Sequence, residues 1–93
     1  MSDKNKTEGL EQDLTKSLDS SGKFLILHND DYHTFDYVID ALVEVCDHDI
    51  EQAVQCTYLV HYRGKADVKR GTYDFLKPMM TQLKGKDLKA TIE

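Results

Sequence analysis

The chain has 93 residues, of which 40% are hydrophobic and 31% are charged, and its formal net charge is −5. A chain of this length forms a single small domain, and no apolar run approaches the roughly 20 residues that a membrane-spanning helix needs. The negative charge argues against nucleic acid as a partner, because a basic patch supplies most of the affinity for phosphates. The opening stretch MSDKNKTEG lacks the apolar core of a secretory signal, so we expect a cytoplasmic protein.

Residues 1–22 are mostly polar and charged, and they end in the sequence DSSG. Three leucines at a spacing of four, Leu10, Leu14 and Leu18, are too isolated to hold a helix by themselves. The pattern predicts a flexible N-terminal arm over residues 1–22 and a folded domain over residues 23–93.

The apolar run KFLILH, residues 23–28, predicts a buried strand. After it, Thr34 can cap a helix whose apolar residues follow at a spacing of three and four as far as Cys46. Asp49 can cap a second helix, and Gly64 is expected to end it. The first half of the domain is therefore expected to be a strand followed by two helices.

The second half of the domain is expected to supply two more strands and a third helix. Residues 65–71 predict a short strand or an extended link, and Thr72 can cap the helix that follows. Pro78 stands inside that helix and removes a hydrogen bond, so we expect the helix to be short, kinked or to begin near Leu76. Residues 88–93 alternate and predict a closing strand. The order β-α-α-β-α-β indicates the α+β class, with a three-stranded antiparallel sheet packed against the helices.

A polar cluster, Asn29, Asp30 and Asp31, follows directly after the first predicted strand. Turn and helix-cap chemistry explains these residue types after any strand. The functional alternative is a compact site of hydrogen-bond acceptors, because carboxylates only accept hydrogen bonds and the Asn carbonyl accepts them too. Such a site suits an ammonium group, which has three donors to satisfy.

Metal binding and catalysis are weaker interpretations of the other polar residues. Cys46, His48, Cys56 and His61 lie in one region, but no CxxC pair exists, and residues 56 and 61 do not share a helix face. We expect neither a metal nor a cofactor. Both cysteines lie in apolar helical patterns, where a thiol is usually inert, so we expect no enzyme activity. A Cys-His dyad in a small enzyme remains an open alternative.

Two longer stretches resemble the ClpS adaptor family. They are LHNDDYHTFDYVIDAL and, after a short gap, EQAVQCTYLVHYRGKA. The family pattern is a strand, NDD, a helix and a second helix that ends in Val-His, here Val60 and His61, with Gly64 and Lys65 close behind. A closing TIE, residues 91–93, is also present. The resemblance covers residues 24–93 and implies a fold like the C-terminal domain of the ribosomal stalk protein.

The resemblance implies an adaptor that is not itself an enzyme. Members of the family bind N-degrons, which are substrates with a free α-amino group and a bulky hydrophobic first residue (Leu, Phe, Tyr or Trp). They deliver these substrates to a Clp-family AAA+ unfoldase, ClpA- or ClpC-like, that is coupled to the ClpP protease.

The resemblance also implies which residues bind the substrate. Asn29 and His61 are expected to contact the amine directly, while Asp30 and Asp31 act through water, charge or loop geometry. The first side chain is expected to enter a pocket between the two helices. The lining carried over from the family is Phe35, Val38, Thr57, Val60 and Leu88, with His33 at the rim.

The chain departs from the family pattern at the pocket. The usual Thr-Pro-Met after NDDY is His33, Thr34 and Phe35 here, and a second family methionine is replaced by Thr57. Phe35 is expected to narrow the pocket or to stack on an aromatic first residue. Thr57 is expected to make the floor smaller and more polar.

The surface expected to face the unfoldase departs as well. Asp74 keeps an acid of the family pattern, but Lys77 stands where Glu is common and Met79 where Lys is common. The partner is then a divergent Clp unfoldase, or the docking has changed. Together with the changes at the pocket, these departures keep open an alternative: an interaction domain on the same fold that has lost or changed N-degron binding.

Overall fold

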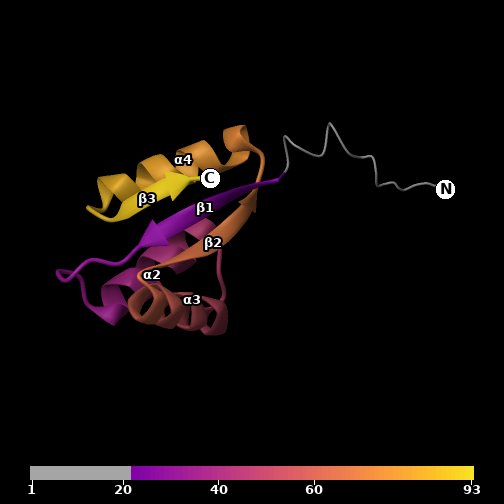
Figure 1. Ribbon diagram of the computed structural model, residues 1–93. Coiled ribbons are helices and arrows are strands. Elements are labelled where there is room, and N and C mark those ends of the chain that lie inside the picture. Colours follow the sequence, from indigo (N-terminus) through magenta and orange to yellow (C-terminus); the bar gives the residue numbers. More distant parts are fainter. Residues whose placement is uncertain (1–21) are drawn as a thin grey trace.

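Strand β1 (Lys23–His28) is the centre of a three-stranded sheet, with β2 (Lys65–Gly71) on one edge and β3 (Lys89–Ile92) on the other (Figure 1). Both pairings are antiparallel, as predicted. The computed structural model describes residues 22–93, so the predicted N-terminal arm lies outside the described residues apart from Gly22. Residues 65–71 form a strand and not merely an extended link.

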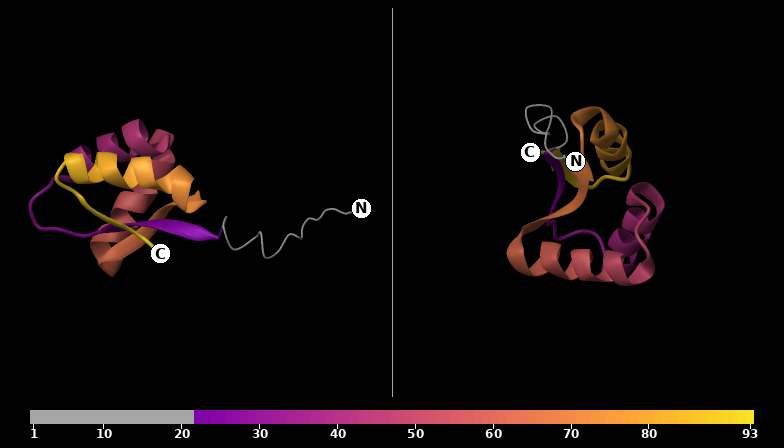
Figure 2. Two further views of the ribbon diagram at one scale, coloured as in Figure 1. Left: turned by 90° about the horizontal axis from the view of Figure 1, so that it is seen from above. Right: turned by 90° about the vertical axis from the view of Figure 1, so that its right-hand side faces the viewer.

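The helices are α2 (Phe35–Cys46), α3 (Ile50–Arg63) and α4 (Tyr73–Gly85). Two perpendicular views place α2 and α4 together on the same side of the sheet (Figure 2). α2 packs against α3, and α4 packs against β3. The order β-α-α-β-α-β confirms the predicted α+β class. None of the helices within residues 22–93 is long and apolar enough to cross a membrane.

Each helix begins where the sequence places a capping side chain. The Thr34 hydroxyl accepts a hydrogen bond from the backbone N–H three residues later, and Asp49 and Thr72 do the same for α3 and α4. Gly64 ends α3 in the left-handed conformation, with φ of 88°, which glycine adopts at little cost. The predicted caps are therefore confirmed.

The expectation that the third helix is short or begins near Leu76 was wrong. α4 begins directly after Thr72, not near Leu76, and runs for 13 residues through Pro78. Proline at this position leaves the Asp74 carbonyl without its helical N–H partner. Because Asp74 and Pro78 are both exposed, that carbonyl can be hydrated instead. The proline therefore destabilises the helix less than the burial of its apolar side chains stabilises it.

The hydrophobic core lies between the sheet and the helices. The side chains of Leu25 and Leu27, two positions apart on β1, point to the same face of the strand and are almost completely buried in this core. Each helix contributes fully buried side chains of its own, and those of α2 and α4 include Leu42, Cys46, Leu76 and Leu83. This packing holds the helices against the sheet. The segment between β1 and α2 is an irregular loop.

A β-bulge interrupts the pairing of β1 with β2, because Leu25 pairs with Lys69 but Ile26 pairs with Asp67. The extra residue is Val68, and its carbonyl accepts a hydrogen bond of 2.6 Å from the buried His48 Nε2. Lys69 Nζ also donates to the Cys46 carbonyl at the end of α2. His48, for which the sequence suggested no structural role, thus joins the bulge to the α2–α3 link.

Candidate functional site

A cavity of about 240 Å³ opens at the C-terminal end of β1. It is enclosed by the end of that strand, the loop over residues 29–34, the first turn of α2, the second half of α3 and the residue before β3. The loop over residues 29–34 is called the acceptor loop below. The lining residues are Leu27, His28, Asn29, Asp30, Asp31, His33, Thr34, Phe35, Val38, Thr57, Val60, His61 and Leu88.

All ten residues that the sequence assigned to amine binding or to the hydrophobic pocket line this one cavity. The structure adds three that sequence reasoning missed, Leu27, His28 and Thr34. His28 directly precedes Asn29, Leu27 is two positions before it, and Thr34 stands between His33 and Phe35. Their closeness in the chain to predicted residues was the signal that could have identified them.

The acceptor loop is tied to the end of α3 by the backbone. The Asn29 N–H donates to the carbonyl of Gly64 at 2.8 Å. Gly64 caps α3, and His61 lies in the last turn of the same helix. The contact therefore joins the start of the acceptor loop to the end of α3, and the exposed residues Asn29 and His61 both line the cavity.

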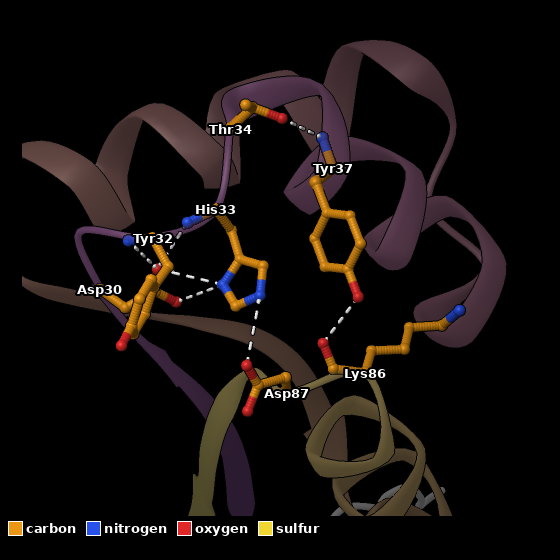
Figure 3. A network of polar contacts seen from close by, with 7 residues as sticks. All are labelled: Asp30, Tyr32, His33, Thr34, Tyr37, Lys86 and Asp87. Carbon is orange, nitrogen blue, oxygen red and sulfur yellow. Dashed lines mark hydrogen bonds and ion pairs between the residues drawn. The ribbon is translucent and has the colours of Figure 1, made fainter.

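Asp30 organises the acceptor loop from within (Figure 3). Its Oδ1 accepts hydrogen bonds of 2.9 Å from the backbone N–H groups of Tyr32 and His33. The His33 ring adds a third donor, with Nδ1 at 3.1 Å from Oδ1 and 3.0 Å from Oδ2. Because a carboxylate only accepts, Nδ1 carries the proton in this arrangement.

These hydrogen bonds keep the Asp30 side chain ionised. Partial burial by itself raises the pKa of this carboxyl, but the hydrogen bonds from His33 and Tyr32 outweigh burial and lower the pKa below its ordinary value. The sequence left open whether Asp30 acts through water, charge or loop geometry, and its observed contacts are those of loop geometry. Asp31, in contrast, is exposed to solvent.

His33 links the acceptor loop to the turn between α4 and β3. Its Nε2 lies 3.8 Å from a carboxylate oxygen of Asp87, and its ring stacks on Tyr37 at a centroid distance of 4.6 Å. The Tyr37 hydroxyl donates to the Lys86 carbonyl at 2.7 Å, so α2 is fixed to the same turn (Figure 3). Leu88, which directly follows Asp87, is buried and lines the cavity.

The apolar side of the cavity contains an aromatic wall and a floor of small side chains. Phe35 contacts the rings of Tyr58 and His61 edge-on, at centroid distances of 5.1 and 5.2 Å. Thr57 and Val60 are buried on α3. The Thr57 hydroxyl donates to the Ala53 carbonyl at 2.7 Å, so its proton is used within the helix. The floor therefore offers a ligand no hydroxyl donor at this position.

Asp74 and Lys77 lie apart from the cavity. Both are exposed on α4, where they border a shallow groove together with Pro78, Thr81 and Gln82. The residues assigned to substrate and those assigned to the unfoldase therefore occupy two separate surfaces.

The cysteines are embedded in the fold. Cys46 is fully buried, and burial raises the pKa of its thiol to about 11, against a smaller opposing effect of Lys69. Cys56 is half-buried, and burial raises its pKa as well. Within residues 22–93, no three His, Cys, Asp or Glu side chains come together in a way that could hold a metal ion.

The cavity can be compared with those of known proteins through the sequence and the fold. Residues 23–91 match the model of the family described as ATP-dependent Clp protease adaptor protein ClpS. The ClpS adapter protein of Cronobacter sakazakii is 42% identical over 57 residues, which are 60% of this chain and 54% of the relative. That of Vibrio atlanticus is 42% identical over 64 residues, which are 69% of this chain and 58% of the relative. The chain thus spans little more than half the length of these relatives.

A solved structure shares the fold. Agrobacterium tumefaciens ClpS2, in a structure bound to L-phenylalaninamide, aligns with a TM-score of 0.68 at 22% sequence identity. The alignment covers 80% of this chain and 96% of that chain.

Proposed function

Because the chain belongs to the ClpS family of ATP-dependent Clp protease adaptors, we propose that it binds N-degron substrates and delivers them to a Clp protease. The substrate is recognised by its free α-amino group and by a bulky hydrophobic first residue. The receiving machine is a Clp AAA+ unfoldase, ClpA- or ClpC-like, together with ClpP. The protein acts as an adaptor in the cytoplasm and catalyses no reaction of its own.

One observation carries this proposal: a single cavity joins hydrogen-bond acceptors to an apolar wall. Asn29, Asp31 and His61 are solvent-exposed residues of its lining, and Phe35 and Leu88 are apolar residues of the same lining. An α-amino group has a pKa of about 7.7–8.0, so near neutral pH it is largely an ammonium with three donors. The Asn carbonyl, the carboxylate and a neutral imidazole nitrogen can accept all three.

The same cavity discriminates against internal residues of a protein. An internal residue presents an amide, which has one donor and no charge, in place of the ammonium. Acceptors left unpaired on binding cost about 1–3 kcal/mol each, which is enough to favour a free N-terminus by an order of magnitude or more.

The known ligand of a protein with the same fold supports this assignment. L-phenylalaninamide, to which ClpS2 is bound, has a free α-amino group, a benzyl side chain and an amide in place of the carboxylate. It therefore has the chemistry of the first residue of a peptide. In this chain, a benzyl group at the corresponding place would meet Phe35, Val38 and Val60.

Fluorescence anisotropy with labelled peptides that differ only at residue one tests the proposal. We expect peptides that begin with Leu, Phe, Tyr or Trp to bind and the Ala peptide to bind at least tenfold more weakly. N-acetylation should abolish binding, because it removes the charge and two of the three donors. Asn29→Ala should abolish it too, whereas the matched control Gln55→Ala, an exposed amide elsewhere on α3, should not.

Failure of every bulky peptide at high micromolar concentration would contradict N-degron binding. The second candidate would then apply, an interaction domain on the same fold that has lost this activity. The departures at Phe35 and Thr57 are the observations that favour it.

The surface of α4 that carries Asp74 and Lys77 is proposed to meet the unfoldase. Its exposure and its separation from the cavity support this, because an adaptor must hold substrate and unfoldase at the same time. Asp74→Lys removes the acid that the family pattern keeps, so it should weaken association with a ClpA- or ClpC-like unfoldase in sedimentation experiments while peptide affinity stays unchanged. Glu51→Lys, an equal charge change at an exposed acid in the first turn of α3, is the control. Equal loss in both variants would indicate a general charge effect and exclude a specific contact.

A further inference from the structure

Four aromatic side chains form a closed ring of contacts beside the cavity. Phe35 contacts Tyr58 and His61 edge-on, as described above. Tyr62 completes the ring, because it lies 5.1 Å from His61 and is stacked on Tyr58, with the two tyrosine rings 5.9 Å apart and almost parallel. Phe35 and His61 line the cavity, whereas the two tyrosines lie outside it. Tyr58 and Tyr62 are called the tyrosine pair below.

The tyrosine pair is open to solvent. Tyr58 is 44% exposed and Tyr62 is 75% exposed, and they lie one turn apart on α3. Isolated exposed aromatic residues are common, but here two stacked rings continue the aromatic wall of a cavity. Tyrosine offers rigid, amphipathic contact area and is enriched where proteins bind other chains. The pair is therefore a surface that extends the cavity outward along α3.

The spacing of an extended peptide identifies what this surface would meet. In an extended chain, residues one and three point to the same side and are about 6.6 Å apart, while residue two points the other way. The ring centroids of Phe35 and Tyr58 are 5.1 Å apart, and the ring of Tyr62 is stacked on Tyr58 at 5.9 Å. A peptide whose first side chain lies against Phe35 thus brings its third side chain within reach of the tyrosine pair.

We infer that Tyr58 and Tyr62 bind the side chain of the third residue of an N-degron and favour an aromatic residue there. The inference rests on the proposed function, since the first residue must occupy the cavity. An aromatic pair outside the cavity strengthens binding about two- to tenfold. The chain would then recognise two positions of its substrate. The first side chain would be bound inside the cavity, and the third would be bound on the exposed surface of the tyrosine pair.

Peptide anisotropy can isolate this contribution. One series keeps a bulky first residue and varies the rest: Ala at positions two and three, Phe at position two only, and Phe at position three only. For the wild-type chain, Phe at position three should lower the Kd about two- to tenfold relative to Ala, and Phe at position two should not. The measured quantity is the Kd of the peptide with Ala at position three divided by the Kd of the peptide with Phe there. Because both values come from the same protein variant, changes in overall affinity cancel.

Matched variants assign the effect to the tyrosine pair. Tyr58→Ala and Tyr62→Ala should bring the ratio close to one, and Tyr58→Phe should preserve it. Tyr73→Ala is the control, because Tyr73 is 46% exposed at the start of α4, away from the cavity, and should leave the ratio unchanged.

The inference is overturned if positions two and three behave alike or if the preference survives both alanine substitutions. In that case, selective binding of peptides with a free amine and a bulky first residue would still uphold the proposed function. Failure of every peptide, including those with Ala at positions two and three, would overturn the proposed function and this inference together.

Discussion

The core and the acceptor loop are stabilised by different interactions, although β1 belongs to one and leads into the other. Leu25 and Leu27 of the strand are packed in an apolar core. Only three residues further on, the backbone is held by hydrogen bonds to the carboxylate of Asp30. Burying a leucine contributes several times more stability than one hydrogen bond near the surface. Substitutions in the core should therefore change folding, and those in the loop should change recognition.

The largest effect is expected in the core, far from the cavity. Leu83→Ala removes a fully buried side chain of α4 and should lower the free energy of unfolding by about 2–5 kcal/mol. Urea denaturation measures it, and Thr81→Ala, at an exposed position of the same helix, should change stability by less than about 0.5 kcal/mol. Folded Leu83→Ala protein should bind peptide as the wild type does. A large loss of affinity in the folded variant would show that core and loop are coupled.

Substitution of His48, which bonds to the bulge in β2, tests whether losing one buried hydrogen bond can destabilise the chain as much as losing a core leucine. His48→Leu should cost about 1–3 kcal/mol of unfolding free energy, because it leaves the Val68 carbonyl buried without a donor. His48→Gln, which can still donate, should lose less. Chemical denaturation of the three proteins under identical conditions gives the ranking. Equal stability of the Leu and Gln variants would mean that His48 acts through packing and not through its hydrogen bond.

Gly64 lies where the two regions meet. Its left-handed conformation should make Gly64→Ala cost about 1–2 kcal/mol, even though the added methyl group would touch nothing. Because the Gly64 carbonyl accepts from Asn29, the peptide affinity of the folded variant should fall as well. Gly85→Ala is the control, since its methyl group also meets open space and its φ is not in the left-handed region. Thermal melts and anisotropy on both variants separate the two effects.

The smallest effect on stability is expected from acid acting on the acceptor loop. The Asp30 pKa is lower in the folded chain than in the unfolded chain. Its contribution is therefore complete above the ordinary carboxyl pKa and is lost as the pH falls through the lower, folded value. The amide NMR signals of Tyr32 and His33 should shift together over that range in acid. In Asp30→Asn this shift should be absent, and a shift that persists in the variant would assign it to another carboxyl group.

The sequence predicted what depends on neighbours in the chain. Helix starts were predictable at Thr34, Asp49 and Thr72, because a capping side chain bonds to an N–H only a few residues away. The course of α4 through Pro78 was not, since it depends on whether water reaches one carbonyl. The bulge at Val68 was also hidden, because its partner His48 comes from a different element.

The candidate site divides in the same way. The resemblance to a family supplied the ten residues that the structure gathers around one cavity. It could not indicate that His33 would reach Asp87, which is 54 positions away, or that Thr57 would turn its hydroxyl to the Ala53 carbonyl. Such contacts depend on the distances between packed helices, and a pattern along one segment does not determine those distances.

The hydrogen bonds that converge on Asp30 have a thermodynamic consequence for binding. The acceptor loop holds its own backbone through the hydrogen bonds from Tyr32 and His33 to Asp30, so a peptide does not have to fix that backbone on arrival. The entropy of ordering a loop is one of the main terms that oppose association. Peptide capture by this chain should therefore be fast, with no slow rearrangement after encounter, and selectivity among N-termini should appear in the dissociation rate.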